Sequence, residues 1–74
     1  MMIEISDMKE VAKEVRRVRK AQGVSQLVLA QLSNVGFRFV RDVEDGKESV
    51  HFGKLLGVLN TLGFSLKLEP PPEG

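Results

Sequence analysis

The stretch from residue 24 to residue 47 constrains the fold of this chain more than any other part. It begins with Ser25, whose side-chain oxygen can accept a hydrogen bond from an amide at the start of a helix. The turn-forming run at 34–36 interrupts the stretch, and Gly46 stands where the end of a helix favours a left-handed residue. Apolar residues at helical spacing lie on both sides of the turn: Leu29, Ala30, Leu32, Val40 and Val43. The sequence therefore predicts two short helices joined by a tight turn, which need further helices to enclose a core.

A longer helix is predicted before this pair. Asp7 and Glu10 have the spacing of a capping box at its start, and it ends near Gln22 and Gly23. Basic residues in its last turns favour the negative end of the helix dipole. One apolar stripe runs along it through Met8, Val11, Ala12, Val15 and Val18.

Another helix is predicted after the pair, with Glu48 or Ser49 as its cap and Gly63 at its end. Its apolar residues are too many for a narrow stripe, so it is either buried on more than one side or in contact with a partner. They are Val50, Phe52, Leu55, Leu56, Val58, Leu59 and Leu62. His51 is interpreted as an ordinary residue of its first turn.

The two ends of the chain have other patterns. Residues 64–68 alternate apolar with polar, which predicts a strand. A strand needs a partner for its amides and carbonyls. That partner is either residues 2–5 of the same chain or the same strand in a second subunit. Three prolines follow at 70–72, so residues 69–74 are expected to form a flexible, proline-rich tail.

Composition limits the class of protein. A single domain of 74 residues has a core that gives only about 3–5 kcal/mol of stability, so association into oligomers is expected. The chain has no cysteine and one histidine, which excludes disulfides and a structural zinc site built from these residue types. No apolar run reaches the roughly 18 residues of a membrane span, and the acidic N-terminus is unlike a secretory signal. These features predict a cytoplasmic protein with no membrane partner.

Two runs of the sequence resemble a known family. Residues 19–47 resemble the Cro/repressor helix-turn-helix proteins, also called the XRE family. The leucine-rich run at 55–63, which leads into one alternating strand, is similar to the HipB-like antitoxins. The matching positions in the first run are Arg19, Gly23–Gln26, Leu29, Ala30, Leu32, Val35, Val40 and Val43–Lys47. The resemblance implies a mostly α fold of four to five helices, with a C-terminal β-strand that pairs across a dimer.

The resemblance also implies how the chain is divided. Residues 1–68 form one DNA-binding domain, with the helix-turn-helix at 25–45 and the dimerisation strand at 64–68. Within that strand, the implied interface residues are Phe64, Leu66 and Leu68. Arg19 and Glu44 match a family ion pair that ties the first helix to the recognition helix. Neither a cofactor nor a metal is implied.

The helix at about 36–45 is expected to enter the major groove of operator DNA. The positions that match the family's DNA contacts are Ser25, Gln26, Gly36, Phe37, Arg38, Arg41, Asp42 and Lys47. Arg38 has the planar fork that reads guanine, whereas Gln26 matches a phosphate contact that also braces the recognition helix. The alternatives are that the arginines only face solvent, that Asp42 only pairs with a neighbouring arginine, and that Phe37 packs or meets a partner.

The sequence departs from the family at Leu27 and Val28, where polar residues are usual, and at Gly36, where serine or threonine usually caps the helix. The two apolar residues suggest a contact with a toxin or a second subunit.

The expected function is a dimeric repressor that acts as the antitoxin of a HipA-like kinase toxin. The alternatives are a phage- or plasmid-type repressor without a toxin, and a protein-interaction module with little DNA affinity. A net charge of +1 supports the last of these. An enzyme is not expected, because the histidine has no catalytic partner.

Overall fold

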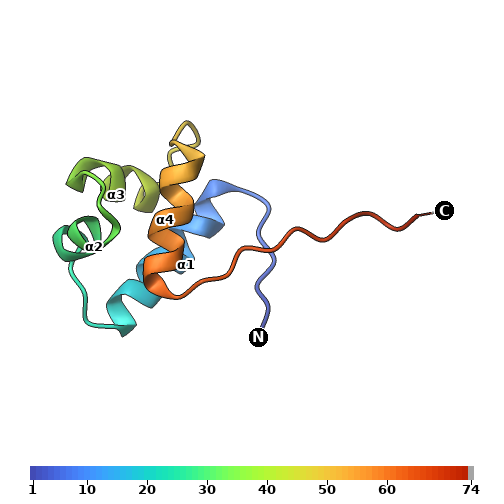
Figure 1. Ribbon diagram of the computed structural model, residues 1–74, viewed down its shortest axis with the longest axis horizontal. Helices are drawn as coiled ribbons and strands as arrows, with labels where there is room; N and C mark the ends of the chain where they lie inside the picture. The colour runs from blue at the N-terminus through green and yellow to red at the C-terminus, as the bar shows by residue number, and fades with distance from the viewer. Residues whose placement is uncertain (74) are drawn as a thin grey trace.

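Four α-helices make up the body of the computed structural model, which describes residues 1–73 (Figure 1). They are α1 (Met8–Ala21), α2 (Gln26–Ser33), α3 (Phe37–Glu44) and α4 (Phe52–Leu62). In Figure 1, α4 crosses α1, and α2 and α3 lie together on one side of this pair. Both ends of the chain leave on the other side. None of the described helices is long and apolar enough to cross a membrane.

The starts of α1 and α2 lie where the sequence predicts them. The Asp7 side chain accepts a hydrogen bond from the amide of Glu10 at 3.0 Å, and the Ser25 Oγ accepts one from the amide of Val28 at 3.1 Å. Each bond satisfies an amide that has no partner inside its helix. These caps fix the positions at which α1 and α2 begin, and α2 is the first helix of the helix-turn-helix.

The helix ends also follow the sequence. Asn34 ends α2 with φ +56°, a left-handed conformation that asparagine tolerates. Gly46 follows α3 with φ +78°, and Gly63 ends α4 with φ +93°. In this conformation glycine avoids the strain that a Cβ atom would bring. The three left-handed residues set the directions in which the chain leaves α2, α3 and α4.

The core is aliphatic and draws on all four helices. Val15, Leu29, Val40, Val43 and Val58 are completely buried. Burying a side chain of this kind contributes about 1.5–3 kcal/mol, so α2 and α3 are stable because α1 and α4 cover them. The buried core consists of Val11, Val15, Leu29, Ala30, Val40, Val43, Leu55, Val58, Leu59 and Leu62.

The start of α4 differs from the prediction. Glu48 and Ser49 lie in a turn, and the helix begins at Phe52. His51 is its cap, because the Nδ1 atom accepts a hydrogen bond from the amide of Lys54 at 3.2 Å. The apolar residues of α4 also separate more sharply than predicted. One stripe, Leu55, Val58, Leu59 and Leu62, is buried, whereas Phe52 is largely exposed.

The C-terminal strand predicted at 64–68 is not present in the single chain, since none of residues 1–73 forms a strand. Phe64 packs partly against the core, and the chain then runs away from the helices (Figure 1). A strand is stable only when another strand pairs with its amides and carbonyls. The N-terminal residues 1–5 line the same groove as 64–70, but the two segments form no ladder within residues 1–73.

Candidate nucleic-acid interface

The outer face of α3 carries the side chains predicted to read DNA. Val40 and Val43 are buried on the inner face, and this orientation turns Phe37, Arg38 and Arg41 to the outside. Phe37 is 43% exposed. Gly36 precedes the helix, is exposed, and leaves open space beside it. The face of α3 opposite the core is therefore free for a ligand.

Asp42 lies between two cations on this face. Its Oδ1 atom is 3.2 Å from the Nε of Arg38, and its Oδ2 atom is 3.7 Å from the Nζ of Lys47. The pairing of Asp42 with a neighbouring arginine, one of the sequence alternatives, is thus present in the free chain. The bond uses only the Nε of Arg38, and the two Nη atoms have no hydrogen-bond partner within residues 1–73. Asp42 therefore orients Arg38 and leaves its planar fork available.

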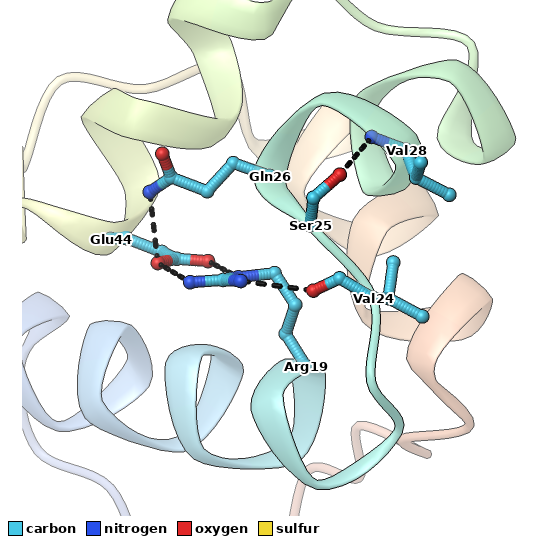
Figure 2. A network of polar contacts seen from close by, with 6 residues as sticks. All are labelled: Arg19, Val24, Ser25, Gln26, Val28 and Glu44. Atoms are coloured by element: carbon cyan, nitrogen blue, oxygen red, sulfur yellow. Dashed lines mark hydrogen bonds and ion pairs between the residues drawn. The ribbon is translucent and has the colours of Figure 1, made fainter.

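The start of α2 is attached to the end of α3 by a side chain. The Nε2 of Gln26 donates a hydrogen bond to the Oε1 of Glu44 at 3.0 Å, as Figure 2 shows. Gln26 is half-buried, whereas Ser25 is exposed. The first amides of α2 and the outer face of α3 therefore keep a fixed relative position.

Arg19 of α1 completes this network (Figure 2). Its Nε and Nη2 atoms contact the two Glu44 carboxylate oxygens at 2.6 and 3.0 Å, and its Nη1 donates to the carbonyl oxygen of Val24 at 2.9 Å. Only 10% of the Arg19 side chain and 3% of the Glu44 side chain are exposed. A bidentate pair of this kind is strong and directional. The predicted partners thus meet, and they join α1, the loop before α2, and α3.

An apolar patch lies on the outside of α2. Leu27, Val28 and Leu32 are 53%, 41% and 64% exposed. Leu27 and Val28 were singled out in the sequence, whereas Leu32 was grouped with Leu29 and Ala30 in a helical repeat. Its spacing of four residues from Val28 indicates the shared outer face, because Leu29 and Ala30 already point inward. We call these three residues the α2 patch.

The three residues predicted at the dimer interface differ in how far their side chains are exposed. Phe64 is partly buried against the core, Leu66 is 43% exposed and Leu68 is 92% exposed. Met2 and Ile3, which line the same groove, are also exposed. The single chain therefore leaves an apolar surface uncovered beside α1 and α4.

Comparison with known proteins identifies the family. No protein-family model matches the sequence. An uncharacterised HTH-type transcriptional regulator of Sinorhizobium fredii, y4mF, is 48% identical over 59 residues, which are 80% of this chain and 78% of that protein. The chain belongs to the HTH-type transcriptional regulators. This result confirms the helix-turn-helix resemblance that the sequence carries.

Solved structures show which variant of the fold this regulator has. HipB in a HipA–HipB–O2–O3 complex superposes with a TM-score of 0.84 at 18% sequence identity, over 96% of this chain and all of that one. HipB in an O1–O2 complex gives 0.83 at 19% identity over 93% of this chain and all of that one. At such identities the likeness shows the fold alone. The HTH regulator therefore has a HipB-like fold.

Proposed function

We propose that this HTH regulator is a DNA-binding repressor that binds a palindromic operator as a homodimer in the cytoplasm. The outer face of α3 carries the proposal, because Arg38 and Arg41 are exposed there while the Arg19–Glu44–Gln26 network fixes the helix from behind. Solved structures of the same fold include a HipB–O1–O2 complex and a HipB–O4 20mer complex, and we interpret O1, O2 and O4 as operator sites. This function requires neither a cofactor nor catalysis.

Binding divides into positioning contacts and reading contacts. Ser25, Gln26 and the first amides of α2 bind phosphate oxygens at the positive end of the helix dipole. Lys47, which follows α3, binds the DNA backbone. Arg38 then offers its free Nη atoms to the O6 and N7 of a guanine. Arg41 reads a base or holds a phosphate, Phe37 and Gly36 approach the groove, and Asp42 either holds Arg38 or accepts from a cytosine amine.

The dimer is proposed to form through residues 64–68. Two copies of this segment, paired antiparallel, satisfy each other's backbone groups and bring Phe64, Leu66 and Leu68 of both chains together. The exposed Leu66 and Leu68 support this arrangement. A two-fold axis there would place two α3 helices about 34 Å apart, one turn of DNA.

The test begins with selection of an operator from random duplexes, followed by affinity measurements on the selected and on unrelated DNA. Arg38→Ala is expected to lose about 1–3 kcal/mol on the operator and little on unrelated DNA. Gln26→Ala serves as the contrast, because loss of a phosphate contact weakens binding to both. Equal losses on both DNAs for Arg38→Ala would make Arg38 a backbone contact. A wild-type protein that selects no sequence would overturn the repressor and favour a protein-interaction module.

We further propose that the regulator is the antitoxin of a HipA-like kinase toxin, which meets Leu27 and Val28 of the α2 patch. Two observations support this proposal: the patch is exposed, and a structure of the same fold is a HipA–HipB complex. The experiment inspects the neighbouring open reading frame, where a kinase-like gene is expected, and coexpresses that gene with the regulator. Wild type is expected to restore growth, whereas Leu27→Ser with Val28→Ser fails to do so and still binds the operator. A wild-type protein that gives no rescue would leave the repressor without a toxin.

A further inference from the structure

One face of α1 carries positive charges that no contact described so far uses. Lys9, Lys13, Arg16 and Lys20 are all exposed. At 3.6 residues per turn they fall within about 60° of the helix circumference and extend over about 16 Å. We call these four residues the α1 stripe.

No residue of the stripe has an ion-pair partner in the part of the chain that the structure describes. The ion pairs within residues 1–73 join Arg17 to Glu14, Arg19 to Glu44, and Asp42 to Arg38 and Lys47. None of these pairs includes a residue of the stripe. The acidic residues of α1 lie on another side of the helix, where Glu10 accepts a hydrogen bond from the amide of Ser6 and Glu14 holds Arg17. A chain of net charge +1 thus concentrates uncompensated positive charge on one face of α1.

This face adjoins the proposed DNA contacts at two places. The Lys9 side chain lies against Gly46, the residue before Lys47. Towards the other end of α1, Arg19 holds Glu44, which in turn holds Gln26. The stripe, Glu44, Asp45 and Gly46 line one open hollow. Asp45 is the only carboxylate of this lining that has no ion-pair partner among residues 1–73.

From this placement we propose that the α1 stripe binds the sugar–phosphate backbone of the DNA that flanks the base pairs met by α3. The inference rests on the proposed operator binding. A duplex carries one negative charge per about 1.7 Å of axis, so a stripe of this length faces several phosphates. Because contacts with phosphates carry no sequence information, binding by the stripe adds affinity and salt dependence without specificity. The stripe thus gives a near-neutral chain a local electrostatic footprint for DNA.

The experiment compares exposed lysines that carry the same charge. Lys13→Gln removes one charge from the stripe, and Lys54→Gln removes one from the exposed side of α4, outside the stripe and outside the proposed DNA and dimer contacts. Operator affinity is measured from about 50 to 200 mM salt on a minimal duplex and on one lengthened at both ends. Each phosphate contact contributes about 0.9 to the slope of log affinity against log salt, so a dimeric Lys13→Gln protein should lose about 2 from this slope.

The expected result is about tenfold weaker binding to the long duplex for Lys13→Gln, with wild-type affinity for Lys54→Gln and near wild-type affinity for Lys13→Arg. Lengthening the duplex should strengthen binding by wild type more than by Lys13→Gln. Unchanged affinity and slope for Lys13→Gln, with normal operator binding by wild type, would overturn this inference but not the proposed function. An acidic protein would then be the alternative partner of the stripe. If wild type binds no DNA, both the inference and the proposed function fail. Equal melting temperatures would show that the variants remain folded.

Discussion

The side chains of Arg19 and Glu44 are both buried, and the effect of Arg19 on stability depends on Glu44. Removing two charges from water costs several kcal/mol for each ion, and only close, hydrogen-bonded contacts offset that cost. Arg19 meets this condition with bonds from three of its nitrogen atoms to Glu44 and Val24. Loss of Arg19 leaves the Glu44 charge buried with no opposite charge beside it, because only the Gln26 amide still donates to that carboxylate.

Arg19→Ala is therefore expected to cost on the order of 3–5 kcal/mol. This is about the whole stability that a core of this size supplies, so the melting temperature should fall by roughly 15 °C or more at neutral pH. Arg17→Ala is the control, because it breaks an exposed pair with Glu14 on the same helix and should barely change the melting curve. Equal curves for the two variants would show that the buried pair does not stabilise the domain.

Some contacts of the candidate site could be predicted from the sequence more directly than others. Arg19 and Glu44 lie 25 positions apart, and only the family pattern indicated that they pair. The same pattern predicted that Gln26 braces the recognition helix, and in the structure the contact is a hydrogen bond to Glu44. The salt bridge of Asp42 with Arg38 is local, at a spacing of four residues, and was open as an alternative. Leu29, Ala30 and Leu32 all fit a helical repeat in the sequence, whereas only the first two face the core.

At the scale of the elements, caps decided which helix boundaries could be predicted. Asp7 and Ser25 are strong cap formers that precede clear apolar periods, so the starts of α1 and α2 were confirmed. The predicted start of α4 was wrong because the sequence favours the pair Glu48 and Ser49 as the cap, whereas His51 is the cap in the structure. The choice of His51 depends on how the chain leaves α3 and how Leu55 enters the core, which is tertiary information.

α3 begins without a side-chain cap, and this can be improved. Gly36 has φ −71° and ψ 151°, which any residue adopts, and a Cβ atom there meets nothing within 4 Å. Gly36→Ser should stabilise the domain by about 0.5–1 kcal/mol, because serine caps better and has fewer unfolded conformations. Thermal melting should show a rise of several degrees. Gly63→Ser is the matched control and should lower the melting temperature, since φ is +93° there. A fall for both variants would contradict this account of the α3 start.

At the scale of the whole molecule, the alternation at 64–68 predicted a strand, and the single chain has none. Alternation reports which side chains share a face, but a strand also requires a partner for its backbone. Residues 1–5 line the same groove without pairing. The four-helix fold could be read from one sequence because its contacts lie within the chain. A strand that forms between two chains could not be placed in this way.

The proposed dimer is tested with proline at two nearby positions. Leu66→Pro removes an amide from the middle of the segment together with an apolar side chain that is 43% exposed in the single chain. In sedimentation this variant should behave as a monomer with an unchanged helical circular dichroism spectrum, because residue 66 lies outside all four helices. Its operator affinity should fall in step, since one half-site then binds alone. Glu69→Pro, just beyond the segment, should leave dimer and affinity intact. A folded Leu66→Pro dimer would mean that the interface lies elsewhere, with the α2 patch as the next surface to test.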